Sequence, residues 1–231
     1  MQLPRLQRER AVDAAYNALR EAIVTHQLTP GSRLNVEALA GQLGVSLTPV
    51  RGAIQRLATE GLVEIRPRSG TFVASLSVED IQETFQIRRA LECLAGELAA
   101  ASITPPELLH LKRIIQELRK PMHDQTDRDL HEQLNSDFHQ AILRASGNRR
   151  LREMYDALNA HIKIARIHAS EAGWAARQRQ ETSEHQAILK ALEAHDPRAA
   201  SDALRRHIDR AMMALLAALR ARLTMERGNP S

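Results

Sequence analysis

The sequence of 231 residues predicts a mainly α-helical protein in two parts, of which only the N-terminal part contains strands. Three observations lead to this prediction. Apolar residues recur at helical spacing along most of the chain. A hairpin pattern occupies residues 62–74. Beyond Ser77 the segments have helical patterns and no strand pattern occurs, so we place the domain boundary between residues 1–75 and 76–231.

The N-terminal part begins with a helix over residues 10–26, followed by a short helix over residues 36–43 that Gly44 ends. Thr48 is expected to cap the next helix, with Pro49 at its first position, where a missing N–H costs nothing. Helical spacing puts Arg51 and Arg56 on the outer side of that helix and its apolar residues behind them, namely Val50, Ile54 and Leu57. A helix, a tight glycine turn and a basic second helix predict a helix-turn-helix.

A β-hairpin follows this second helix directly and predicts the wing of a winged helix. Residues 62–65 and 71–74 are its strands, and residues 66–70 form a tight turn with Arg66 and Arg68 at the tip. Residues 1–75 contain nine arginines, no lysine and six acidic residues. Arginine suits bidentate contacts with phosphate and guanine, so this part is expected to bind double-stranded DNA.

The C-terminal part is predicted to be an antiparallel all-α bundle of six or seven helices. Serine, threonine and proline residues start several of its helices, and glycine or proline follows several of their ends. The six clearest helices span residues 77–102, 104–120, 126–145, 150–172, 175–194 and 196–222.

Composition excludes several classes of protein. The single cysteine, Cys93, rules out an internal disulfide framework, and no apolar run is long enough to span a bilayer. The arginine-rich N-terminus lacks the apolar segment of a signal peptide, so we expect a cytoplasmic protein. No His-Glu-x-x-His or comparable constellation occurs, and we do not expect an enzyme.

Two regions resemble a known family. Residues 12–74 resemble the winged-helix domain of GntR-family transcriptional regulators, and residues 77–220 resemble the FCD effector domain of its FadR-like branch. The first resemblance is carried by Pro30-Gly31, Leu39-Ala40, Leu43-Gly44-Val45-Ser46, Thr48-Pro49-Val50-Arg51, Gly61-Leu62 and Pro67-Arg68-Ser69-Gly70. The second is carried by Arg88-Arg89-Ala90-Leu91-Glu92, Phe138-His139, Ala145-Ser146-Gly147-Asn148, Glu184 to Leu189 and Arg206-His207.

The resemblance implies a homodimer that binds operator DNA. Leu47 and Gly52 depart from the family pattern, in which an arginine and a glutamate are usual, and these departures bear on the operator sequence. The predicted helix-turn-helix and wing, together with the resemblance, give the expected DNA-binding residues. They are Ser46, Thr48, Pro49, Arg51, Gln55, Arg56, Arg66, Arg68 and Gly70.

Three histidines on three predicted helices fall on inward faces. They are His139, His185 and His207, and Asn135 precedes His139 by one turn. Imidazole is a common ligand of zinc, nickel, copper and iron. From the residues alone a metal site and a polar pocket without metal both remain open. His131, His161 and His168 are weaker candidates for the same pocket.

The resemblance implies a metal on an Asp/Asn-x3-His pair and two later histidines, which here are Asn135, His139, His185 and His207. The expected cofactor is a divalent metal, zinc first and then nickel, manganese or iron. Arg88 falls on the apolar face of its helix, and a buried arginine requires an anionic partner. That anion is either an inward acid such as Glu92 or the carboxylate of an effector.

The sequence therefore predicts a ligand-responsive transcriptional regulator, a repressor, that senses a small organic acid beside a metal. The alternative is the same DNA-binding role with a metal-free pocket for an apolar or acyl ligand.

Overall fold

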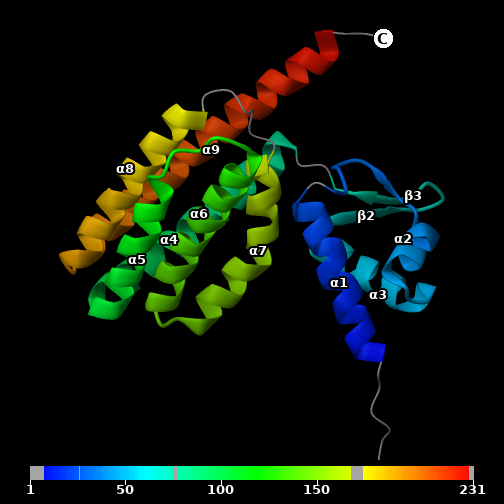
Figure 1. Cartoon of the computed structure of the whole chain (residues 1–231), viewed down its shortest axis with the longest axis horizontal. Helices are drawn as coiled ribbons and strands as arrows, with labels where there is room; N and C mark the ends of the chain where they lie inside the picture. Colours follow the sequence, from blue (N-terminus) through cyan, green and yellow to red (C-terminus); the bar gives the residue numbers. More distant parts are fainter. Residues whose placement is uncertain (1–7, 26, 75–76, 168–173, 229–231) are drawn as a thin grey trace, which may run out of the picture. The chain divides into compact units, whose positions relative to one another are not determined.

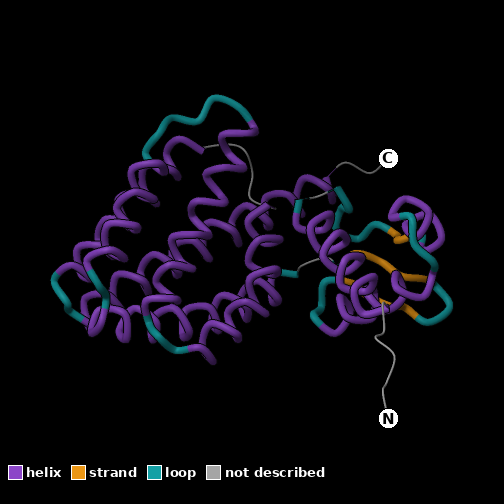
Figure 2. Tube along the Cα trace, turned by 60° about the horizontal axis from the view of Figure 1, so that its bottom comes forward, coloured by secondary structure: helices purple, strands orange, loops and turns teal. Residues whose placement is uncertain are grey.

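The computed structural model describes residues 8–25, 27–74, 77–167 and 174–228. They form two compact units, one made up chiefly of residues up to 77 and the other of most residues from 78 onward. Within the described residues, strands occur only in the first unit (Figure 2). The mainly helical fold class is therefore confirmed.

The first unit contains the helices α1 (Arg8–Val24), α2 (Val36–Leu43) and α3 (Leu47–Thr59). Asn35 caps α2 with its side chain, and Gly44 ends α2 in the left-handed conformation with φ 64°. The α2 helix and its glycine stop match the sequence prediction residue for residue.

The start of α3 differs from the prediction. The helix begins at Leu47 and its N-cap residue is Ser46, so Thr48 lies inside the first turn and is not the cap. Pro49 is at the third helical position and is buried. This position also tolerates proline, because no N–H in the first turn has a partner within the helix. The predicted packing face is confirmed, with Val50, Ile54 and Leu57 buried.

The first unit also contains a three-stranded antiparallel sheet in the order β1-β3-β2. The predicted hairpin is present as β2 (Val63–Arg66) and β3 (Gly70–Val73), with Glu64 opposite Phe72. The third strand, β1 (Arg33–Leu34), pairs with β3 and was not predicted. Two residues are too few to show the alternation that indicates a strand.

The second unit is a helical bundle (Figure 1). Its described helices begin and end within a few residues of the predicted positions, with two exceptions. The α9 helix continues beyond residue 222, and the predicted end of the fourth helix near residue 172 lies outside the described residues. They are α4 (Val78–Ser102), α5 (Pro105–Leu118), α6 (Gln125–Ala145), α7 (Arg149–Ile167), α8 (Trp174–Glu193) and α9 (Pro197–Gly228). No helix among the described residues has the length and hydrophobicity needed to cross a bilayer.

The bundle core combines an apolar region with a polar one. The α4 and α9 helices pack closely, and a Cβ atom at Gly96 would lie 2.3 Å from Leu204 Cδ1, so glycine permits this approach. Buried polar side chains project inward from four helices. They are Thr84, Arg88 and Glu92 of α4, His131, Asn135 and His139 of α6, Gln178, Glu181, Thr182 and His185 of α8, and His207 of α9.

Candidate DNA-binding surface and buried histidine cluster

One stripe of α3 is exposed along the whole helix. Thr48, Arg51 and Gln55 follow at helical spacing and are all exposed, as is Ser46 just before them. Within the described part of the chain, Arg51 has no ion pair or hydrogen-bond partner for its side chain. Its guanidinium is therefore available to an external anion or base edge.

Arg56 lies on another side of α3 and is held by α1. Its Nη1 is 2.9 Å from Asp13 Oδ1, and its guanidinium lies 3.9 Å from the centre of the Tyr16 ring. Glu60 adds a longer contact of 3.7 Å. Arg56 and Asp13 are both substantially exposed, so their ion pair contributes about 1 kcal/mol or less and leaves Arg56 able to exchange partners.

The wing carries two of the predicted arginines in different states. Arg66 pairs with Glu64 at 2.6 Å and lies over the Phe72 ring. Arg68 is exposed, and its φ of 64° places it at the tight tip of the turn. Among the described residues no acid pairs with Arg68, so it is the freer of the two cations.

Arg33 is a third arginine of the wing, and no residue spacing in the sequence indicated it. It projects from β1, and its Nε lies 2.9 Å from the point where a Cβ atom of residue 70 would stand. Gly70 has φ 124°, which also favours glycine. A glycine at position 70 therefore lets the Arg33 guanidinium lie across the wing.

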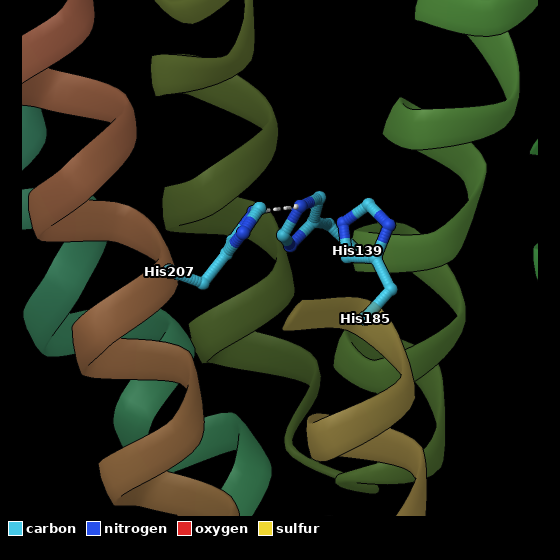
Figure 3. A group of neighbouring side chains, drawn as sticks. All are labelled: His139, His185 and His207. Carbon is cyan, nitrogen blue, oxygen red and sulfur yellow. Dashed lines mark hydrogen bonds between the residues drawn. The ribbon is translucent and has the colours of Figure 1, made fainter. Parts of the chain in front are cut away.

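The three inward histidines meet in the interior of the bundle, as predicted. Figure 3 shows His139 of α6, His185 of α8 and His207 of α9 pointing toward one another. All are buried, and one ring nitrogen of each lies within 4.8 Å of the others. The Nε2 atoms of His139 and His207 are 3.2 Å apart. Asn135 is fully buried one turn before His139 on α6.

Burial favours the neutral form of these rings. It lowers the pKa of His139 to about 3, against the opposing effect of Glu92, and it lowers the pKa of His207. Neutral imidazole is the form that coordinates a metal. Three convergent imidazoles, with the buried side-chain carbonyl of Asn135 one turn away as a further candidate ligand, fit a divalent metal of the zinc type. The chemistry of the donor set therefore agrees with a metal centre.

Arg88 is buried beside the histidines. Its Nε donates to Glu92 Oε1 at 2.6 Å, which makes Glu92 the internal partner that the sequence suggested. Its Nη2 lies 3.3 Å from His139 Nε2. Its Nη1 is buried and has no hydrogen-bond partner among the described residues. A ligand carboxylate is one group that would satisfy this nitrogen.

Glu184 and Arg210 belong to the network around the histidines and were not predicted as site residues. Glu184 contacts His207, and Arg210 pairs with Glu184. Arg210 follows His207 by three residues, so helical spacing offered a signal for it. Glu184 offered none, because it acts across helices. His131 is buried near Glu181, whereas the side chains of His161 and His168 lie outside the described residues.

Comparison with known proteins identifies the family. Residues 11–73 match the family described as bacterial regulatory proteins, gntR family, and residues 83–210 match the FCD domain. The chain belongs to the GntR family of transcriptional regulators, with an FCD domain. It is a DNA-binding regulator of a non-enzymatic family, as the sequence predicted.

Individual relatives support this assignment over most of the regulator. A probable D-xylose utilization operon transcriptional repressor of Paenarthrobacter nicotinovorans is 33% identical, over 80% of each chain. The transcriptional repressor RspR of Escherichia coli is 30% identical, over 84% of this chain and 83% of its own. Among solved structures, E. coli McbR/YncC is 27% identical with a TM-score of 0.76, covering 89% of this chain and 96% of its own.

Proposed function

We propose that this regulator is a repressor whose operator binding is controlled by a small organic acid held beside a divalent metal. Two of the relatives are named as repressors, which supports the direction of control. The observation that carries the proposal is the contrast between a free, exposed Arg51 and a buried site of three histidines and Arg88.

The DNA-binding role rests on the exposed stripe of α3. Arg51 and Gln55 contact base edges in the major groove, while Ser46, Thr48 and the helix N-terminus hold a phosphate. The buried Pro49 shapes the first turn, and Gly70 leaves room for the Arg33 side chain on the wing. Arg56, Arg66 and Arg68 bind the DNA backbone or the minor groove.

A homodimer is part of the proposal, because one winged helix reads half of a palindromic site. On α4, Ile87, Ala90 and Leu94 form an exposed stripe that is free of charge, and we propose it as the dimer face. Leu94→Glu is expected to give monomers in light scattering, whereas Leu109→Glu, at an exposed leucine of α5, leaves the dimer intact.

In the bundle, His139, His185, His207 and Asn135 would hold the metal, with zinc as the first candidate and nickel, manganese or iron as others. A bound metal supplies a Lewis-acidic anchor for a carboxylate oxygen. Arg88 holds the same carboxylate through its Nη1 and so fixes its orientation. A ligand held there releases DNA if it binds one dimer geometry better than the other.

The test of the DNA-binding surface is Arg51→Ala in a gel shift with operator DNA from a selected library. We expect loss of specific binding with an unchanged melting temperature. Arg113→Ala, which removes the same charge from the surface of α5, serves as the matched control. Equal operator affinity for Arg51→Ala and wild type would refute the assigned surface.

The test of the metal is elemental analysis of the purified protein and of the double variant His185→Ala, His207→Ala. We expect about one divalent ion per subunit in wild type and loss of that ion in the variant. Wild-type metal content in the double variant would rule out the ligand set. A wild type that takes up no metal would favour the metal-free pocket for an apolar or acyl ligand.

The domain split at residues 75–76 and a cytoplasmic location stay predictions. Limited proteolysis tests the first, since cleavage near residue 75 should release a stable bundle fragment. The location follows from the proposed action on DNA.

A further inference from the structure

A line of three ionisable side chains crosses the interior from α4 to α6. Arg88 Nε donates to Glu92 Oε1 at 2.6 Å, and His139 Nδ1 lies 2.5 Å from Glu92 Oε2. Glu92 is 2% exposed, so both of its oxygens are out of water. We call this set the Arg88 triad.

A second set of the same composition joins α8 and α9. Arg210 Nε donates to Glu184 Oε1 at 2.5 Å, and His207 Nδ1 lies 2.8 Å from Glu184 Oε2. We call this set the Arg210 triad. Each triad places a glutamate between an arginine and the Nδ1 atom of a histidine in the buried cluster.

Each glutamate determines which ring nitrogen carries the hydrogen. Each glutamate forms an ion pair with an arginine, Glu92 with Arg88 and Glu184 with Arg210, and arginine stays charged in proteins, so each glutamate is present as a carboxylate. An ionised carboxylate accepts hydrogen bonds and does not donate them. His139 and His207 must therefore donate through Nδ1, and each neutral ring has its lone pair on Nε2.

The two lone pairs face each other. The Nε2 atoms of His139 and His207 lie 3.2 Å apart, and neither has a hydrogen to donate to the other. Two lone pairs that face each other repel, so this arrangement is unfavourable unless a cation lies beside it and binds them. The cationic Arg88 contacts this pair, since its Nη2 is 3.3 Å from His139 Nε2.

We propose that Glu92 and Glu184 are positioning residues that fix the imidazoles of His139 and His207 as Nε2 ligands and thereby set the metal affinity. This inference rests on the metal site of the proposed function. Neither glutamate is a metal ligand in this account, because both of its oxygens are already used by an arginine and a histidine.

The two triads differ in their exposure to water. Glu92 is 2% exposed and Glu184 is 20% exposed. Water can replace part of what Glu184 provides, whereas nothing replaces Glu92. We therefore expect the larger effect on metal affinity at Glu92. The Arg88 triad also joins the proposed carboxylate anchor to a metal ligand, which the Arg210 triad does not.

Replacement of either glutamate by glutamine tests the tautomer directly. An amide has one acceptor oxygen and a donor NH₂ group, but the arginine and the histidine both need an acceptor. When the NH₂ group faces Nδ1, the ring shifts its hydrogen to Nε2 and can no longer bind a metal through that atom. The change is nearly isosteric, so packing is preserved.

The experiment uses full-length metal-free protein as wild type, Glu92→Gln, Glu184→Gln and the control Glu97→Gln, an exposed α4 residue. Calorimetric titration with Zn²⁺ and Co²⁺ gives the dissociation constants, and the Co²⁺ absorption spectrum reports the ligand field. Nitrogen-15 NMR of the histidine rings reports the tautomers. Loss of a carboxylate behind a ligating histidine typically weakens metal binding 10- to 100-fold.

We expect Glu92→Gln and Glu184→Gln to weaken binding by that factor, to alter the Co²⁺ spectrum and to give Nε2–H signals for His139 and His207, respectively. Glu97→Gln should match wild type. If Glu92→Gln does not fold, Glu184→Gln, whose site is partly exposed, decides the matter. A folded Glu184→Gln with wild-type affinity and Nδ1–H rings overturns this inference and leaves the metal site standing. A wild type that binds neither ion overturns both.

Discussion

The arginines of the two units differ in their exposure to water and in their partners. In the first unit Arg51 is exposed and unpaired within the described residues, and the closest acidic partners of Arg56 and Arg66, Asp13 and Glu64, are exposed. In the second unit Arg88 is fully buried and bonded to a carboxylate that is itself buried. The same side chain is therefore a loose surface charge in one place and part of a fixed internal network in the other.

This difference teaches where each function resides. DNA binding gains from cations that are solvated, because their contact with phosphates releases counterions. A sensing site gains from charges out of water, because each contact there is stronger and fewer are needed. The exposed arginines are thus expected to affect DNA affinity with little effect on stability. Arg88 is expected to affect stability with little effect on DNA affinity.

The largest expected effect comes from breaking the buried pair. Arg88→Met leaves Glu92 without its cation in a dry interior, which is expected to reduce the free energy of unfolding by about 3–5 kcal/mol. Arg51→Met, at an exposed site, should change it by about 0.5 kcal/mol or less. Urea denaturation followed by circular dichroism measures both. A similar loss of unfolding free energy in Arg88→Met and Arg51→Met would show that the arginines of the two units do not differ in their contribution to stability.

The next effect is the pH dependence of the bundle. The pKa of His139 falls to about 3 on burial, whereas an unfolded histidine titrates near 6.5. Between these values the unfolded chain binds more protons, so stability is expected to fall as pH decreases from about 6.5 toward 3. Denaturation at pH 7 and pH 5 in a chelator measures this.

Two variants sharpen the pH experiment. His139→Phe should reduce the slope of stability against pH, while the exposed His110→Ala should leave it unchanged. Equal stability of the wild type at both pH values would contradict the burial of neutral histidines.

A smaller effect distinguishes the arginines of the DNA surface. Arg33 has no acidic partner among the described residues, whereas Arg56 is bound to Asp13. If Arg33 meets a phosphate, Arg33→Ala lowers the slope of log affinity against log salt by about 1, with little loss of sequence preference. Arg56→Ala should lower it less. Fluorescence anisotropy over a salt series checks both, and an unchanged slope for Arg33→Ala would exclude it from the interface.

The smallest effect concerns Gly52, in the middle of α3. A Cβ atom there would lie 3.4 Å from both Val12 methyl groups, which is ordinary contact. Gly52→Ala should therefore stabilise the protein by up to about 1 kcal/mol through helix propensity. Thermal unfolding tests this. A lower melting temperature would show that α1 and α3 need the glycine for close packing.

Local signals explain what the sequence could predict. Helical spacing and a glycine stop defined α2, and spacing alone placed His139, His185 and His207 on inward faces. Contacts between distant segments had no such signal. Asp13 reaches Arg56 across 43 positions, Glu184 crosses to another helix, and β1 exists only because β3 pairs with it. These features depend on packing, which sequence periodicity does not encode.

Coupling between the buried site and the operator decides whether the bundle controls DNA binding. Operator dissociation constants would be measured by anisotropy for wild type and Arg88→Lys, with and without the small carboxylate that most raises the melting temperature of the metal-loaded protein. Allosteric coupling is typically worth about 5- to 150-fold in affinity. We expect that carboxylate to weaken wild-type operator binding at least fivefold and to leave Arg88→Lys unaffected. Two results would contradict the proposed function. One is an operator affinity that stays the same with every carboxylate that stabilises the protein, and the other is an equal loss of affinity in wild type and Arg88→Lys.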